Sequence, residues 1–269
     1  MFRDSRQMMR VLSQYRKGQQ RAHPAVKKVP RHYQKVRIHL NHVRKGSRRG
    51  FAPMDKICNW NIRGLNWSNK QEDAKFFLHE KQIGMVGLLE TKVKERNVDL
   101  VADELLQGCS WRHNFNHNAK GRIWIAWRPG KYIVNIIAIS NQFIHCKATQ
   151  IRTMKSFFIT YVYGANHELQ RRDLWEALKH IASGMEEAWC MLGDFNSILY
   201  SGDRLGGMEV QDYEVKSFGE CIATSELQEL QCNGSHFTWT NKIIWSKIDR
   251  VFVDNSCFIC NFFLYFAYF

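Results

Sequence analysis

From Lys56 onward, short apolar runs rich in β-branched and aromatic residues alternate with amphipathic stretches, and this order leaves few architectures open. IGMVGLLE, RIWIAWR, YIVNIIAI and SFFITYVYG have the length and composition of buried strands. The stretch RRDLWEALKHIASGM predicts an amphipathic helix, because Leu174, Ala177, Leu178 and Ile181 recur at helical spacing. Strands in two batches with helices between them predict an α/β fold of two packed sheets with outer helices, rather than a doubly wound parallel sheet.

The positive charge of the chain is concentrated at its beginning. Residues 1–50 hold 15 of the 39 Lys and Arg residues and one of the 25 acidic residues, so the remainder is neutral although the formal net charge is +14. Few large apolar residues accompany these charges, and burial could hardly offset the entropy lost on ordering. We therefore expect residues 1–53 to form a disordered basic arm and residues 54–269 to form the folded domain.

A basic arm of this kind can bind phosphate backbones without regard to sequence, or serve as a nuclear address. The nucleic-acid contacts that we expect there are Arg44, Lys45, Arg48 and Arg49. An incidental solvated extension is the alternative.

Eight cysteines, most of them inside apolar runs, suit reduced thiols of an intracellular protein. Cys257 and Cys260 form a lone CxxC, which lacks the second pair that a zinc site needs. No apolar stretch near Met1 resembles a secretory signal, and the terminal run FFLYFAYF falls short of the roughly 20 apolar residues that span a bilayer. We expect a nuclear or nucleocytoplasmic protein that does not enter a membrane.

Polar residues stand where the apolar runs stop. In AWCMLGDFNSI, strand alternation puts Asp194 and Asn196 on the same face. Four other runs deliver an acid, an amide or a phenol at the corresponding place: Glu90, Asn61, Tyr163 and Asp249. A carboxylate there is costly unless it meets water, a cation or a partner. Each has a structural explanation when taken singly, such as an Asx turn at Asp194, but the whole set favours a functional site.

Such a set suits phosphodiester hydrolysis. Hard oxygen ligands favour Mg²⁺, with Mn²⁺ as the alternative, and the expected ligands are Glu90 and Asn61. No glycine-rich nucleotide motif of the G-x-G-x-x-G or G-x-x-x-x-G-K-[ST] type occurs, so we expect no small-molecule cofactor.

The remaining residues of the set have the chemistry of catalytic groups. Asp194 would orient or deprotonate the attacking water, and Asn196 and Tyr163 would donate hydrogen bonds to the phosphate. Asp249 would orient a neighbouring base.

The motifs NWNIRGL, GLLETK, VYGAN, LGDFN and SKIDRV, in this order, resemble the endonuclease/exonuclease/phosphatase superfamily. Within it they are most similar to the apurinic-type endonuclease domain that opens the polyprotein of plant LINE-type retrotransposons. RRDLWEALKHI, SGDRLGG and FTWTN are similar to the same subgroup, and the resemblance covers about Lys56 to Phe269.

The resemblance implies a four-layer α/β/β/α sandwich and Mg²⁺-dependent nicking of DNA, which leaves a 3′-hydroxyl that primes reverse transcription. Asn61 and Glu90 match the metal-site asparagine and glutamate, and Tyr163 matches the phosphate-contacting tyrosine. Asp194 matches the water-orienting aspartate, and Asn196 matches the phosphate-contacting asparagine. Asp249 matches the aspartate of the late strand.

Two departures from the family pattern bear on activity. Arg63 stands where the apurinic enzymes often carry an aspartate. The family also has a Ser-Asp-His motif after the strand that follows SKIDRV, and no such motif follows here. We therefore expect FFLYFAYF to be an inner strand with an exposed edge, in a domain that is C-terminally incomplete and weak or inactive as a nuclease. His236 and His167 are the candidates to replace the histidine, but surface roles suit both better.

The function expected from the sequence is thus an Mg²⁺-dependent DNA endonuclease of retrotransposon origin. The alternative is a non-catalytic nucleic-acid-binding relic that uses the basic arm.

Overall fold

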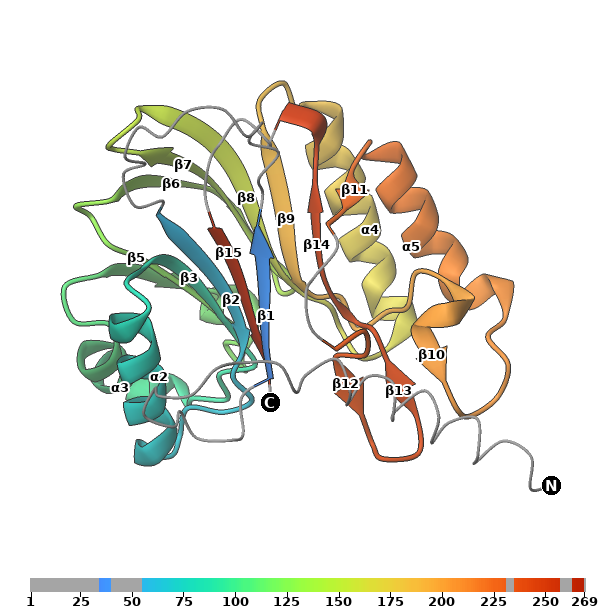
Figure 1. Cartoon of the computed structure of the whole chain (residues 1–269), viewed down its shortest axis with the longest axis horizontal. Coiled ribbons are helices and arrows are strands. Elements are labelled where there is room, and N and C mark those ends of the chain that lie inside the picture. The colour runs from blue at the N-terminus through green and yellow to red at the C-terminus, as the bar shows by residue number, and fades with distance from the viewer. Residues whose placement is uncertain (1–33, 40–54, 231–234, 257–262, 269) are drawn as a thin grey trace, which may run out of the picture. The chain divides into compact units, whose positions relative to one another are not determined.

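Two six-stranded sheets lie face to face in the computed structural model of the chain (Figure 1). The structure describes residues 34–39, 55–230, 235–256 and 263–268, all within the unit Tyr33–Phe269. Only the backbone is described for 34–39 and 263–268. The predicted arm contacts Arg44, Lys45, Arg48 and Arg49, and the CxxC cysteines, lie outside the described residues.

The first sheet has the strand order β1-β15-β2-β3-β5-β4. Its strands are β1 (Gln34–His39), β15 (Phe263–Tyr268), β2 (Lys56–Asn61), β3 (Ile83–Leu89), β5 (Ile123–Trp127) and β4 (Ser110–His113). β2 is parallel to both β15 and β3, so the carboxyl ends of these three strands meet at the same edge.

The second sheet has the order β11-β14-β9-β8-β7-β6. Its strands are β11 (Gln228–Glu229), β14 (Asp249–Val253), β9 (Trp189–Asp194), β8 (Lys155–Tyr163), β7 (Phe143–Gln150) and β6 (Tyr132–Ile139). β8 and β9 are parallel, and β14 runs antiparallel to β9. A small third sheet joins β10 (Arg204–Leu205), β13 (Trp245–Ser246) and β12 (Trp239–Thr240).

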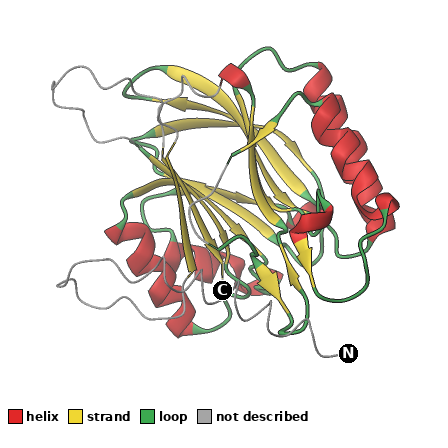
Figure 2. Cartoon of the chain, turned by 45° about the vertical axis from the view of Figure 1, so that its right-hand side comes forward, coloured by secondary structure: helices red, strands yellow, loops and turns green. Residues whose placement is uncertain are grey.

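Helices cover the outer face of each large sheet (Figure 2). They are α2 (Ser68–Glu80), α3 (Val98–Leu105), α4 (Glu168–Ser183) and α5 (Asp212–Thr224), with short 3₁₀ turns at Glu95–Asn97, Phe115–His117 and Ser201–Asp203. Among the residues described, none of the helices combines the length and the apolar character that a membrane crossing needs.

Three apolar cores separate the four layers. The central core packs the inner faces of the sheets together, with Ile57 and Ile125 from one sheet and Leu192 and Val251 from the other. The second core lies between the first sheet and α2 and α3, and the third lies between the second sheet and α4 and α5. The predicted α/β/β/α sandwich is confirmed.

A glycine allows the two sheets to approach closely at one point. A Cβ at Gly87 of β3 would lie 2.1 Å from the ring of Tyr161 in β8, so the tyrosine occupies the space that any larger residue would need. Tyr161 is fully buried, and its ring fills the centre of the sandwich.

Most predicted elements are present with adjusted ends. The stretch RRDLWEALKHIASGM forms most of α4, as predicted, and IGMVGLLE and SFFITYVYG contribute β3 and β8. Helix α5 was missed, although Phe218, Cys221 and Ile222 form its buried face at helical spacing.

The two ends of the described chain pair with each other. β15 lies between β1 and β2, so FFLYFAYF contributes an inner strand as expected, but its outer edge is covered by β1 rather than exposed. β1 itself comes from the segment expected to be disordered, and this difference arises because antiparallel pairing with β15 satisfies the backbone of residues 34–39.

Candidate active site

Five strands bring their polar residues to the same end of the sandwich. Alternation aims Asn61 of β2 into the space between the sheets, on the same face as the core residue Ile57. From the second sheet, Tyr163 pairs with Asp194 in the register of β8 and β9, and Asp194 pairs with Asp249 in the register of β9 and β14. Asn61 Nδ2 donates a hydrogen bond of 2.7 Å to Asp194 Oδ2, which joins the two sheets.

Asp194 and Asp249 form a pair of buried carboxyl groups on neighbouring strands, with 3% and 4% of their surfaces exposed. Burial raises the pKa of Asp194 well above its usual value, the charge of Asp249 adds to this, and the backbone N–H of Asn196 opposes it. Burial also raises the pKa of Asp249 to about 7, against a hydrogen bond from Thr238. Burial therefore favours the protonated form of both acids, and for Asp194 the neighbouring charge of Asp249 adds to this.

Glu90 follows β3 directly and is surrounded by cations. Its carboxylate lies 2.9 Å from Lys92 Nζ, 3.7 Å from Arg122 Nη1 and 3.8 Å from Arg63 Nε. The backbone is left-handed at Glu90, Lys92 and Arg63, with φ of 54°, 53° and 46°. Left-handed conformations are unfavourable for residues with a Cβ, and such strain gathers at functional sites.

Backbone hydrogen bonds hold this left-handed turn in place. Gly64 N donates to Glu90 O at 2.8 Å, and Leu65 N donates to Thr91 O at 2.7 Å, so the loops after β2 and β3 bind each other. The turn therefore presents the Glu90 side chain in a fixed position, with 16% of that side chain exposed.

Tyr163 lies at the end of β8 and is 5% exposed. Its hydroxyl accepts a hydrogen bond of 3.0 Å from Arg122 Nη1, and the guanidinium carbon lies 5.3 Å from the centre of its ring. Burial, with the nearby charges of Asp194 and Glu90, raises the pKa of Tyr163 well above its usual value. The hydroxyl therefore keeps its proton at neutral pH.

Asn196 is half-buried and left-handed, with φ of 48°. Its backbone N–H donates to Asp194 Oδ1 at 2.9 Å, which is the Asx turn weighed as the structural explanation of this motif. Its side-chain Nδ2 donates to Gly164 O at 2.7 Å. The turn fixes one oxygen of Asp194 while Asn61 fixes the other.

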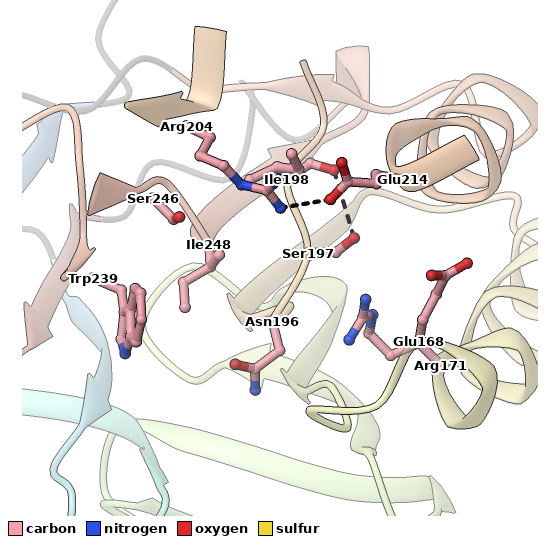
Figure 3. A pocket seen from close by; sticks show the side chains of 10 residues that line it. All are labelled: Glu168, Arg171, Asn196, Ser197, Ile198, Arg204, Glu214, Trp239, Ser246 and Ile248. Atoms are coloured by element: carbon pink, nitrogen blue, oxygen red, sulfur yellow. Dashed lines mark hydrogen bonds and ion pairs between the residues drawn. The ribbon is translucent and has the colours of Figure 1, made fainter. Parts of the chain in front are cut away.

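A pocket of about 210 Å³ opens beside Asn196 (Figure 3). Trp239 and Ile248 lie on one side of it, and Arg171 and Glu168 lie on the other. Arg171 Nη1 is held by the carbonyl oxygens of Ala165 and Asn166, at 2.9 Å each. The pocket therefore combines an aromatic wall with a fixed guanidinium next to the predicted site.

The donor atoms at this end suit a hard divalent cation. Asn61 Oδ1 and Asp249 Oδ1 are buried acceptors without a hydrogen-bond partner in the described residues, and Glu90 adds a partly exposed carboxylate. Mg²⁺ is commonly held by one or two carboxylates, with waters and phosphate oxygens completing its shell. No cluster of three or more His, Cys, Asp and Glu side chains with metal-binding geometry is found in the described part of the chain. The residues thus fit a magnesium ion with few protein ligands.

All six residues predicted for the site lie in the described part of the chain, and hydrogen bonds or strand pairing link five of them: Asn61, Tyr163, Asp194, Asn196 and Asp249. Glu90 is connected to them through Arg122. The candidate histidines are elsewhere: His236 Nε2 lies 3.9 Å from Asp203 Oδ1, and His167 is exposed and precedes α4 as expected.

Sequence reasoning missed Arg122 and Thr238. Arg122 stands between a glycine and the apolar run of β5, which looks like an ordinary strand start. The Thr238 side chain accepts the backbone N–H of Asp249 at 3.0 Å, a contact between segments 11 residues apart that strand alternation does not reveal.

A sandwich of two sheets with buried acids, amides and a phenol at one end has donor and acceptor groups suited to phosphoester hydrolysis. The sequence matches the model of the endonuclease/exonuclease/phosphatase family over residues 58–265, and the chain belongs to this family. These hydrolases are typically metal-dependent, and the nucleases among them act on nucleic acids. No curated protein matches the chain.

Solved structures with the same fold are distant in sequence. The endonuclease domain of TRAS1, a telomere-specific non-LTR retrotransposon, is 14% identical over 74% of this chain and 84% of its own, with a TM-score of 0.57. The AP endonuclease LMAP from Leishmania major is 15% identical over 81% of this chain and 84% of its own, with a TM-score of 0.58. A mannosyl-6-phosphatase from Bacteroides thetaiotaomicron is 14% identical over 74% of this chain and 85% of its own, with a TM-score of 0.50. At these identities the matches show the fold alone.

Proposed function

We propose that this chain is an Mg²⁺-dependent phosphodiester hydrolase of the DNA endonuclease type, derived from a LINE-type retrotransposon. The observation that carries the proposal is the hydrogen bond from Asn61 to Asp194, because it joins the predicted metal site of one sheet to the predicted water site of the other. The sequence motifs of the retrotransposon subgroup and the shared fold of the TRAS1 endonuclease domain support the assignment to DNA.

In the proposed reaction, water attacks phosphorus and the bond from phosphorus to O3′ breaks. The products are a 5′-phosphate and a 3′-hydroxyl. Asp194 accepts the proton of the attacking water, and its two oxygens are oriented by Asn61 and the backbone of Asn196. Asp249 lies beside Asp194, and its charge raises the pKa of Asp194 and so the affinity of this base for the proton.

Two further groups bind the phosphate. Because Arg122 is the donor in its bond to Tyr163, the hydroxyl hydrogen of Tyr163 is free to donate to a phosphate oxygen. Asn196 uses one N–H of its amide on Gly164, and the second can reach a substrate in the adjoining pocket. Asn61 and Glu90 would hold Mg²⁺, which supplies charge stabilisation for the phosphate and the leaving oxygen.

A low rate is part of the proposal. Among the described residues, no histidine forms a hydrogen bond or ion pair with Asn61, Glu90, Asp194 or Asp249, so the proposal assigns none of them as the proton donor to the leaving O3′. A segment that carries the Ser-Asp-His motif, joined after Phe269, should therefore raise the rate.

Nicking of supercoiled plasmid tests the proposal. The full chain should convert plasmid to the open-circular form with Mg²⁺ but not with EDTA, and Asp194→Asn should lower the rate by about 100-fold or more. Asp212→Asn, at an exposed acid of α5, is the matched control and should leave the rate unchanged. A version lengthened by the Ser-Asp-His segment raises the sensitivity of the assay.

Absence of nicking in both the original and the lengthened chain would contradict the proposal. Binding of DNA that is unaffected by Asp194→Asn and falls steeply with salt would then favour the non-catalytic binder. Faster turnover of a small phosphomonoester than of plasmid would instead favour a phosphatase.

A further inference from the structure

Arg122 lies between two predicted site residues that belong to different sheets. Its backbone oxygen accepts the N–H of Glu90 at 2.8 Å in the first sheet. Its side-chain Nη1 donates to Tyr163 Oη at 3.0 Å in the second sheet and lies 3.7 Å from Glu90 Oε1. No role in the reaction follows from the sequence motifs for this residue.

Neutralising Glu90 does not require Arg122. The N–O distance of 3.7 Å is too long for a hydrogen bond, and Lys92 is closer to the same oxygen, at 2.9 Å. A partly exposed ion pair of this length contributes little to stability. The contact with Glu90 therefore does not explain the position of the guanidinium.

The guanidinium of Arg122 has donors to spare. It carries five N–H bonds, and the bond to Tyr163 is the one hydrogen bond that it makes within the described residues. One fifth of the side chain is exposed, so its free donors are accessible to a substrate. A planar guanidinium with free N–H groups suits the oxygens of a phosphodiester.

The backbone presents Arg122 in a fixed position. Thr91 Oγ1 donates to Gly121 O at 3.0 Å, and Ile123 N donates to Asn114 Oδ1 at 3.0 Å. Gly121 has φ of 46°, and a Cβ there would lie 2.1 Å from the ring of Phe115, so this turn accepts glycine alone. A side chain held by such supports is preorganised for binding.

We propose that Arg122 is a catalytic residue of this site, which binds a non-bridging oxygen of the scissile phosphodiester and holds the Tyr163 hydroxyl against the same group. The inference rests on the proposed function for its substrate. Arg63 is a poorer candidate, because it lies 3.8 Å from Glu90, is 31% exposed and does not contact Tyr163.

The test compares Arg122→Met and Arg122→Lys in the full chain. Arg152→Met is the matched control, because Arg152 is exposed in the turn between β7 and β8, at the far end of β8 from Tyr163. The first readout is fluorescence anisotropy of a labelled DNA duplex, in EDTA, over a series of salt concentrations. The logarithm of the association constant for DNA falls linearly with the logarithm of the salt concentration. Arg122→Met should make this slope shallower by about 1, while Arg122→Lys and the control should leave it unchanged.

The second readout is the single-turnover nicking rate with Mg²⁺. Arg122→Met should lower it by about 100-fold, and Arg122→Lys should recover part of the loss because it restores charge but not the planar fork. Melting temperatures of all variants, measured alongside, separate this result from a folding defect.

Each outcome decides the inference. An unchanged salt slope overturns it, whether or not the variants lose stability, because a merely structural arginine releases no counterions from DNA. If Arg122→Met changes the salt slope of DNA binding but the chain never nicks DNA, the contact between Arg122 and phosphate is supported and the proposed function is overturned. Nicking that is lost in Asp194→Asn but kept in Arg122→Met would keep the proposed function and overturn the role of Arg122.

Discussion

Asp249 and Arg250, which are adjacent residues of β14, enter two groups of acids that differ in their partners. Asp249 faces the inside of the sandwich and lies beside Asp194, and no cation contacts either carboxylate in the described residues. Arg250 points to the opposite face, where its guanidinium binds Asp203 and lies 2.7 Å from Glu229.

Structural and functional acids differ in how fully their oxygens are paired. Asp203 is further satisfied by the backbone N–H groups of Leu199 and Tyr200, at 3.0 and 2.7 Å, and Glu229 by Lys247 at 2.6 Å. A buried acid with a full set of partners is a structural element, whereas a buried acid pair with a raised pKa and free lone pairs is poised for a proton or a cation.

Removal of the central cation should have the largest effect on stability. Arg250 is fully buried, and Arg250→Met leaves Asp203 and Glu229 without their shared partner. We expect the free energy of unfolding to fall by about 3–5 kcal/mol. Urea denaturation followed by circular dichroism measures it, with Arg152→Met as a control that stays within about 0.5 kcal/mol. A loss below 1 kcal/mol for Arg250→Met would contradict the prediction, because it would show that Asp203 and Glu229 do not depend on this cation.

A buried base without a charged partner gives a pH-dependent effect. His145 Nδ1 is 2.8 Å from Thr160 Oγ1, and burial lowers the pKa of this histidine to about 4. The pKa of His145 in the folded chain lies below the unfolded value of about 6.5. The contribution of this histidine to the free energy of unfolding is therefore complete above pH 6.5 and is lost as the pH falls towards 4.

Replacing His145 should therefore reduce acid destabilisation. Between pH 7 and pH 5, His145 removes about 2 kcal/mol from the free energy of unfolding, and His145→Asn should reduce the pH dependence by that amount. Urea titrations at the two pH values measure the difference, with exposed His167→Asn as the control. Equal pH dependence in wild type and His145→Asn would contradict the prediction.

The acid pair Asp194 and Asp249 should give a pH dependence of stability opposite in sign to that of His145. Since the pKa of Asp249 is raised to about 7, its ionisation opposes folding increasingly as the pH rises from about 4 to 7. Asp249→Asn imitates the protonated acid and should stabilise the chain by about 1–2 kcal/mol at pH 8, while nicking falls. Asp212→Asn should change neither. Destabilisation by Asp249→Asn at pH 8 would contradict the prediction, because it would show that the ionised Asp249 is stabilised by partners, as Asp203 and Glu229 are.

The smallest effect should come from the rim of the outer group. Lys247 is partly exposed and pairs with Glu229, which keeps Arg250 as its second partner. Lys247→Met should therefore cost about 1 kcal/mol, measured by the same urea titration. A loss as large as that of Arg250→Met would mean that the two cations act as one unit. Lys216→Met, at an exposed residue of α5, is the control.

Much of the fold was predictable because its signals are local. Apolar runs of strand length and the face of α4 follow from composition and spacing, and the order of these elements favours two packed sheets. The pairing of β1 with β15 joins residues from opposite ends of the chain, and no local pattern indicates it. Helix α5 was missed although its pattern was present.

The residues at the ends of the strands can be read from the sequence, and alternation gives the faces of Asn61, Tyr163, Asp194 and Asp249. Glu90 and Asn196 lie beyond their strands with left-handed backbones, so alternation does not place them. The tertiary structure decided the partners: Asn61 and Asp194 are 133 positions apart, and only the packing of one sheet on the other brings them within 2.7 Å. The same holds for Arg122, whose meaning depends on Tyr163 across the sandwich. Alternation is a property of one strand, whereas distances, burial and the resulting pKa shifts are set by the elements that pack against it.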